Sequence, residues 1–287
     1  MIFKKLPPLR IQNLWLFFIL TFMFSWLFWI IGFLLYEAES TIPVLIFLYI
    51  GGVIPPIVAI LLIYMRHTPE ERRDYFQRVI GFKWIGTKWY AVIFLTAPVL
   101  AGLGAILDVM TGGKGIASET AAHFTTHPLA MLLFAVFMLL FGPLPEELAW
   151  RGYALEQLQK RWNALAASLF LGTVWTVWHL PLFLIPGSYQ HGLGLGTEAF
   201  WLFMADKIPL SVLMTWVYNN NRRSTLSAVL FHFSVNFVGE LFQLTTQAKL
   251  FYIIFYILAA IVVTVFWGPQ KMVRKGWNIE KSQYGPN

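Results

Sequence analysis

The sequence predicts an all-α integral membrane protein, with about eight transmembrane helices in a single domain over residues 1–287. Two observations predict this fold class. Hydrophobic residues make up 58% of the chain and charged residues only 12%, whereas ordinary soluble domains contain about 25% charged residues. The hydrophobic residues also form separate stretches of about 20 residues, the length that a helix needs to cross a bilayer. The chain has no cysteine, which excludes disulfides and thiolate catalysis.

The first half of the chain contains four of these stretches. The first follows a short basic segment and is too long for a signal peptide, so we expect it to remain as a helix. The second contains Pro55 and Pro56, which predict a kink whose freed backbone groups neighbouring helices satisfy. The four predicted spans are 14–36, 42–65, 89–107 and 128–145, the last followed by an amphipathic segment over 146–161.

The second half contains four more stretches, and two of them carry ionisable residues. The sixth span holds Asp206 and Lys207, and the seventh holds His232 and Glu240. The predicted spans are 163–186, 199–218, 225–242 and 250–267.

The distribution of basic residues predicts the orientation, because cytoplasmic loops collect Lys and Arg. With both termini in the cytoplasm, 18 of the 21 basic residues fall in inner segments, including the polar connector 67–88, while Lys114 and Lys249 fall in outer loops. The net charge of +7 comes from short clusters between apolar stretches, so we expect a lipid bilayer and no nucleic acid as partner. A bacterial plasma membrane is the expected location.

Two adjacent acids directly after the fourth apolar stretch are the first candidates for a functional site, because charges at membrane depth are costly and usually functional. Glu147 and Arg151 are four residues apart and can pair on a helix, while Glu146 points about 100° away and stays free. Pro143 and Pro145 disfavour a regular helix before them and suit the first turn of a new one.

Two later segments add polar groups at membrane depth. His179 follows Trp175 by four residues, and His232 and Asn236 have the same spacing, which places each pair on one helix face. Each feature alone also has a structural explanation, such as a packed histidine or hydrogen bonds between helices. Together, a free carboxylate, two histidines and an amide supply what hydrolysis of a peptide bond by water requires.

These residues form three ordered motifs that resemble the CPBP family of intramembrane proteases, which contains the type II CAAX prenyl endopeptidases and the bacterial Abi proteins. The motifs lie within 146–236 and are E-E-x-x-x-R-G (Glu146, Glu147, Arg151, Gly152), aromatic-x-x-x-H (Trp175, His179) and H-x-x-x-N (His232, Asn236). The family commonly has Phe where this chain has Trp175, which bears on the shape of the substrate pocket.

The resemblance implies a role for each matching residue and an intramembrane endopeptidase as the function. Glu146 would activate the attacking water with His179 as its partner, and His232 and Asn236 would stabilise the oxyanion. Glu147 and Arg151 would be the supporting ion pair. The substrate would be a peptide or a membrane-protein segment; neither its prenylation nor an oligomeric state is indicated by the sequence.

A metal is a separate question. Glu146, His179 and His232 resemble the His₂Glu donor set of zinc hydrolases, but the chain has no H-E-x-x-H segment, and the resemblance implies a glutamate-dependent reaction without an obligatory metal. We therefore expect that no divalent metal such as zinc is required.

Counting along straight helices places the site residues at different depths. Glu146 is about 27 Å from residue 128, near the cytoplasmic face, whereas His232 is about 13 Å and His179 about 24 Å from the starts of their segments. They meet only if a helix begins outside the membrane or if the prolines turn Glu146 inward, and we expect a water-filled cavity that opens to the cytoplasm.

Two other classes of function remain open from the sequence. A proton-coupled transporter or channel would use Asp206, Lys207 and Glu240 with the histidines as a relay. Because Asp206 and Lys207 are adjacent, we expect that they do not face each other as a simple pair. A catalytically idle immunity or scaffold protein would keep its function without Glu146.

Overall fold

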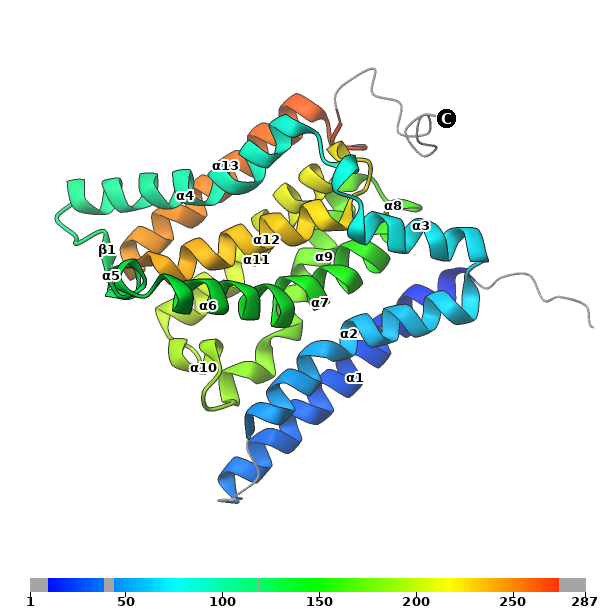
Figure 1. Cartoon of the computed structure of the whole chain (residues 1–287), viewed down its shortest axis with the longest axis horizontal. Helices are drawn as coiled ribbons and strands as arrows, with labels where there is room; N and C mark the ends of the chain where they lie inside the picture. Colours follow the sequence, from blue (N-terminus) through cyan, green and yellow to red (C-terminus); the bar gives the residue numbers. More distant parts are fainter. Residues whose placement is uncertain (1–9, 39–43, 118, 274–287) are drawn as a thin grey trace, which may run out of the picture.

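The computed structural model describes residues 10–38, 44–117 and 119–273, and almost all of the regular structure within them is helical (Figure 1). The basic residues Lys4, Lys5, Arg274, Lys275 and Lys281 and the predicted start of the second span at Ile42 lie outside this part. The α-helices are α1 (Arg10–Glu37), α2 (Val44–Arg66), α3 (Pro69–Ile80), α4 (Thr87–Met110), α5 (Glu119–Thr126), α6 (Pro128–Phe141), α7 (Pro143–Ala149), α8 (Glu156–Gln159), α9 (Ala164–Trp178), α10 (Tyr189–Leu193), α11 (Glu198–Asn220), α12 (Thr225–Leu241) and α13 (Thr246–Trp267).

The remaining elements are short. Two 3₁₀ turns follow α3 and α9, a π-helix separates α7 from α8, and two short strands pair antiparallel. Their bounds are η1 (Phe82–Trp84), η2 (Trp150–Leu155, the π-helix), η3 (Leu180–Leu184), β1 (Ile116–Ala117) and β2 (Gln243–Leu244).

The predicted polytopic helical fold is confirmed. In the described part, seven helical segments are long and apolar enough to cross a membrane. The apolar helix α12, with 17 residues, corresponds to the remaining predicted span. The protein is therefore an integral membrane protein.

The fourth predicted span, 128–145, continues into the amphipathic segment that follows it. The α6 helix ends before Gly142, and α7 begins with Pro143 in its first turn. The chain then stays helical through η2 and α8, so that one helical segment covers Pro128–Gln159. Glu146 lies in the interior of this segment.

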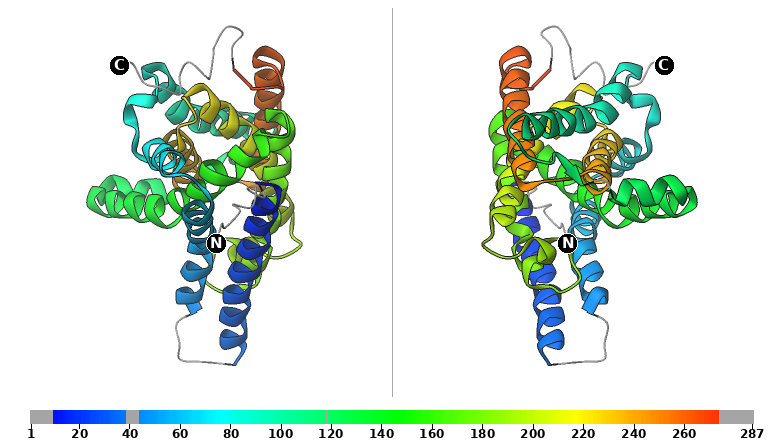
Figure 2. Two further views of the ribbon diagram at one scale, coloured as in Figure 1. Left: turned by 90° about the vertical axis from the view of Figure 1, so that its right-hand side faces the viewer. Right: turned by 90° about the vertical axis from the view of Figure 1, so that its left-hand side faces the viewer.

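The helices pack in an arrangement that brings distant segments together. The α1–α2 pair extends beyond the rest of the molecule at one end (Figure 2). The α4 helix runs along α13, and α11 packs against α9, α12 and α13. At Gly172, an added Cβ would lie 3.0 Å from the Cα of Ile208, so the absence of a side chain lets α9 and α11 approach closely, as is common between membrane helices.

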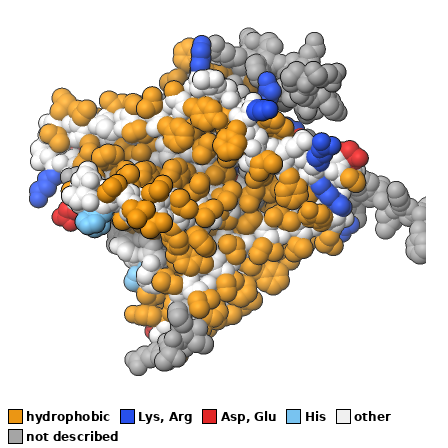
Figure 3. All heavy atoms as spheres, viewed as in Figure 1, with side chains coloured by type: hydrophobic (Ala, Val, Ile, Leu, Met, Phe, Trp, Pro, Cys, Tyr) orange, Lys and Arg blue, Asp and Glu red, His pale blue; other side chains and the backbone are white. Residues whose placement is uncertain are grey.

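The outer surface is mostly apolar. Figure 3 shows hydrophobic side chains over most of one face, with Lys and Arg near its edges. Large exposed hydrophobic residues lie on α1, α2, α4, α6 and α13. An apolar surface of this extent is not stable in water, and it fits contact with lipid.

The predicted connector 67–88 contains a capped helix. Thr68 accepts a hydrogen bond from the backbone N–H of Glu71, whose side chain accepts one from the backbone of Thr68, and Pro69 occupies the first turn of α3. This capping box begins a helix whose inner face buries Tyr75 and Arg78.

A buried aspartate ties α4 to the start of α13. Asp108 Oδ2 accepts hydrogen bonds from the backbone N–H of Gly115, at 2.7 Å, and from Thr245 Oγ1, at 2.9 Å. Thr245 in turn caps the N-terminus of α13. The β1–β2 pair, with Ile116 opposite Leu244, lies beside this contact, so the position at which α13 begins is fixed from two directions.

Candidate functional site

The four predicted catalytic residues line one cavity of about 250 Å³. Glu146 comes from α7, His179 from the C-terminal end of α9, and His232 and Asn236 from one face of α12. The proximity that the three motifs predict therefore exists in this fold.

Glu147 forms the centre of a buried hydrogen-bonded group. Arg151 Nη1 donates to Glu147 Oε1 at 3.0 Å, as the i, i+4 spacing predicts. His232 Nδ1 lies 2.9 Å from the same oxygen, and because a carboxylate only accepts, Nδ1 carries the proton. Asn236 Nδ2 lies 3.2 Å from His232 Nε2. Glu147 thus fixes the orientation of His232, and His232 that of Asn236.

Glu146 has a different environment. It is partly exposed, and its Oε2 accepts a hydrogen bond from Trp175 Nε1 at 2.6 Å. None of the described ion pairs involves Glu146. Trp175 was expected to affect only the shape of the pocket, but its indole also positions this carboxylate, which a phenylalanine would not do because it has no donor.

Trp175 also contacts the other members of the site. Its backbone carbonyl accepts a hydrogen bond from His179 Nδ1 at 2.7 Å, which leaves His179 Nε2 as the nitrogen available for chemistry. The Trp175 ring lies edge-on to His232, with ring centroids 5.1 Å apart, and Arg151 Cζ lies 4.9 Å from the ring centroid.

The expectation that Asp206 and Lys207 do not pair is wrong. Lys207 Nζ lies 2.6 Å from Asp206 Oδ1, and Lys249 Nζ lies 3.1 Å from Asp206 Oδ2. Long, flexible lysine side chains reach the carboxylate although the two Cβ atoms of adjacent residues diverge. Lys249, assigned to an outer loop from the sequence, lies in the first turn of α13 and lines the same cavity as Glu146.

The donors of a His₂Glu metal site are not presented together. Both ring nitrogens of His232 already have partners, Glu147 and Asn236. Over residues 10–38, 44–117 and 119–273, no group of three histidine or acidic side chains is arranged to hold a metal ion. These residues therefore do not fit a metal.

Part of the cavity lining comes from segments that the charge-based orientation places toward the outer face. These residues are Tyr189, Gln190, Glu240 and Lys249. The cytoplasmic opening of the cavity stays a prediction.

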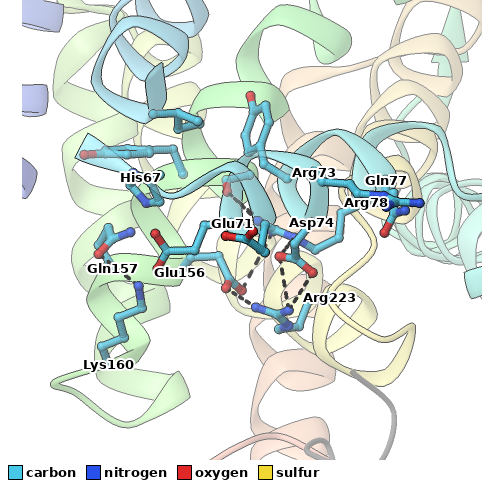
Figure 4. Close-up of a pocket in the computed structure, with 15 residues that line it drawn as sticks. His67, Glu71, Arg73, Asp74, Gln77, Arg78, Glu156, Gln157, Lys160 and Arg223 are labelled. Carbon is cyan, nitrogen blue, oxygen red and sulfur yellow. Dashed lines mark hydrogen bonds and ion pairs between the residues drawn. The ribbon is translucent and has the colours of Figure 1, made fainter. Parts of the chain in front are cut away.

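A second cavity, of about 720 Å³, lies between α3, η2, α8 and the turn after α11 (Figure 4). Asp74, Arg78, Glu156 and Arg223 meet here and form the α3 charge cluster. Arg78 donates from Nε to Asp74, at 2.9 Å, and Arg223 contacts both acids. Figure 4 shows these four side chains directed toward one another.

The charged groups of the α3 charge cluster are paired with one another and with Tyr218. Tyr218, which lies beside it, accepts a hydrogen bond from Arg78 and donates one to Glu156. Burial opposes the charge on Arg78, but Tyr218, Glu156 and Asp74 outweigh it and hold the pKa of the guanidinium above its ordinary value. This group therefore has a structural role.

The α3 helix also satisfies backbone groups of the π-helix. A π-helix shifts hydrogen bonds from i+4 to i+5, which frees carbonyl groups near its ends. Tyr75 Oη donates to the carbonyl of Leu148 at 2.9 Å, and Arg78 donates to that of Gly152. Burial raises the pKa of Tyr75, so it stays a donor. Neither residue stands out in the sequence, although Thr68-Pro69-Glu70-Glu71 carries the capping-box pattern.

Comparison with known proteins agrees with this site. A protein-family model described as "Type II CAAX prenyl endopeptidase Rce1-like" matches residues 128–238, which include all three motifs. A curated relative, "CAAX prenyl protease 2" of Methanococcus maripaludis, is 29% identical over 254 residues, which are 86% of this chain and 92% of the relative. Residues 128–238 are thus similar to the Rce1-like CAAX prenyl endopeptidases, and both likenesses support a hydrolase of peptide bonds.

Proposed function

We propose that the protein cleaves its substrate with a water molecule that Glu146 activates. The observation that carries this proposal is the pairing of the two adjacent acids. Glu147 is bound to Arg151 and His232, whereas Glu146 faces the cavity with a single described hydrogen bond, from Trp175. A carboxylate that no cation neutralises is able to take a proton from water.

The reaction proceeds in two steps. Glu146 takes a proton from the water while the water oxygen attacks the carbonyl carbon of the scissile bond. The carbon–nitrogen bond then breaks, and Glu146 returns the proton to the leaving nitrogen, which regenerates its carboxylate. His179, held by its Nδ1, presents Nε2 to the water and orients it.

Asn236 stabilises the oxyanion that forms between these steps, and His232 positions Asn236. The amide of Asn236 has two N–H donors, of which one contacts His232 Nε2, so the other is available to the substrate oxygen. Glu147 and Arg151 act through His232 and keep this donor in place. Preorganised donors of this kind contribute about 2.7–4 kcal/mol to lowering a reaction barrier.

The substrate class follows from the names of the similar proteins. We propose a peptide or protein with a CAAX-type C-terminus as the first substrate to test, in prenylated and unmodified forms. The reaction uses no resident metal, and we expect activity to survive extensive dialysis against a chelator.

The proposal is tested with the full-length protein purified in detergent, a panel of CAAX-type peptides and detection of products by mass spectrometry. We expect Glu146→Ala to abolish cleavage without changing thermal unfolding, and Glu198→Ala, at an exposed site on α11, to behave as wild type. Cleavage retained by Glu146→Ala would disprove the role of this residue. Comparing the peptides of membranes that carry wild type and Glu146→Ala identifies the natural substrate.

No specific observation favours a transporter. Asp206, on which a relay would depend, is held by two lysines, and both comparisons are with proteases.

A further inference from the structure

Two lysines share one aspartate in the cavity that holds Glu146. Lys207 Nζ contacts one oxygen of Asp206 and Lys249 Nζ contacts the other. The side chains of Lys207 and Asp206 are 12% and 6% exposed, so the group is nearly withdrawn from solvent. The two ammonium groups therefore share one directly bound carboxylate.

Both ammonium groups retain unused hydrogen-bond donors. A lysine has three N–H donors, and each of these lysines has one described hydrogen-bond or ion-pair partner, Asp206. The remaining described contacts of Lys207 are with aromatic faces, 4.0 Å from the Phe203 ring centroid and 5.7 Å from that of Trp175. Ammonium donors left without a partner in such surroundings are costly unless an acceptor such as an anion joins them.

The other acids of the cavity do not fill this position. Glu146 and Glu240 line the cavity as well, but the described ion pairs of both lysines are with Asp206 alone. Glu146 and Glu240 both reduce the net positive charge of the cavity without occupying the free donors. An anion that contacts both ammonium groups must therefore come from a bound molecule.

The position of the lysines relates this anion to the substrate. Trp175 donates to Glu146 from its indole nitrogen, and Lys207 lies over the same ring, so one short extended peptide segment reaches both. A neighbouring cavity of about 510 Å³ shares Lys249 and has apolar walls that include Leu193, Leu202 and Val238.

We infer that Lys207 and Lys249 form a subsite that binds a carboxylate of the substrate, next to apolar residues. The carboxylate is either the C-terminal one or an acidic side chain. This inference rests on the proposed function, because the substrate is the one that Glu146 cleaves.

Binding without turnover tests the subsite. Fluorescein-labelled CAAX-type peptides are titrated into the full-length Glu146→Gln protein, and fluorescence anisotropy gives the dissociation constant. One peptide ends in a free carboxylate and a second in an amide. A third, amidated peptide carries Glu near its end, and a fourth has Gln in its place. We expect the free carboxylate to bind about tenfold more tightly than the amide.

Two further substitutions locate the effect. Lys249→Gln should weaken binding of the free carboxylate about tenfold and leave the amide unchanged. Lys114→Gln, the same change at an exposed loop position, should alter neither. Because Lys249 is 28% exposed, we expect its variant to fold, and Lys207→Met provides a second test. Tighter binding of the Glu peptide than of the Gln peptide would identify a side chain as an accepted source of the carboxylate.

Equal affinity for the peptide with a free carboxylate and for the amidated peptide would overturn the inference. An equal loss of affinity for both peptides in Lys249→Gln would also overturn it. These outcomes are distinct from failure of the proposed function. If the protein prefers the free carboxylate but wild type does not cleave, the subsite is supported and the protease mechanism is contradicted. If wild type cleaves but shows no such preference, the mechanism is supported and the subsite is contradicted.

Discussion

The molecule contains two clusters of acidic and basic side chains, the α3 charge cluster and the group around Glu146. They differ in how many of their charged atoms have hydrogen-bond or ion-pair partners. In the α3 charge cluster, all three side-chain nitrogens of Arg78 have partners, and two acids balance two arginines. In the cavity of Glu146, two ammonium groups share Asp206. Outside the cavity lining, Glu147 Oε2 and two nitrogens of Arg151 have no described hydrogen-bond partner. Complete pairing indicates a structural role, and incomplete pairing indicates a place for substrate and water.

The largest effect on stability is expected from a substitution that removes one cation from the α3 charge cluster. Arg78→Met leaves Asp74 and Glu156 without one of their cations, and breaking a buried ion pair from one side costs about 3–5 kcal/mol. We expect a loss of this size in the free energy of unfolding, measured by denaturation in mixed micelles. Arg73→Met, on the exposed face of the same helix, should change it little. Equal stability of the two variants would contradict the structural role of the cluster.

A smaller effect, on catalysis alone, is expected at the indole that holds Glu146. Trp175→Phe removes the N–H donor, and a hydrogen bond to a charged group contributes about 1.5–3 kcal/mol, which corresponds to a decrease in kcat of roughly 10- to 100-fold. KM should change little. The control is Trp178→Phe on the same helix, because Nε1 of Trp178 has no described partner. If both variants lower kcat equally, ring volume and not the hydrogen bond is responsible.

The contact between α3 and the π-helix should have a modest effect on stability. Tyr75→Phe removes the donor to the carbonyl of Leu148, and we expect a loss of about 1 kcal/mol in the free energy of unfolding. The exposed Tyr64→Phe provides the matched control. A thermal shift assay in detergent is sufficient, and identical shifts for the two variants would show that this hydrogen bond does not stabilise the fold.

A labelling experiment tests on which side of the membrane each of the two clusters lies. It does not depend on a change in stability or activity. Because the chain has no cysteine, single cysteines can be placed at Gln190, beside the site cavity, and at Gln77, beside the α3 charge cluster. From the positive-inside rule we expect an impermeant maleimide added to intact cells to label position 190, and position 77 only after permeabilisation. The opposite pattern would reverse the orientation.

Much of the fold was predictable because a membrane-spanning helix can be recognised from about 20 neighbouring residues. Within such a stretch, apolar residues avoid water and charged residues avoid lipid. The Glu147–Arg151 pair was predictable for a similar reason, since i, i+4 neighbours on a helix meet whatever surrounds them. The helix through residues 146–159 was predictable as the amphipathic segment that follows Pro143 and Pro145. The π-helix within it was not, because no local pattern in these residues marks a shift to i+5 hydrogen bonds.

The contact between Asp206 and Lys249 was not predictable either. These residues are 43 positions apart and on different helices, and no local pattern joins them. Their meeting depends on where α13 begins, which is set by Asp108 and the β1–β2 pair. A contact that forms only when three separate segments have docked cannot be predicted from the spacing of residues along the sequence.

The attachment of α13 to Asp108 has a consequence for biosynthesis. Glu146 enters the membrane with the middle of the chain, whereas Lys249, Tyr252 and Tyr256 complete the cavity wall from the last helix. Thr245 reaches Asp108 only when that helix has been synthesised and has docked on α4. A nascent chain therefore carries its proposed base before it has a finished cavity, and we expect cleavage of bound peptides only after α13 has docked.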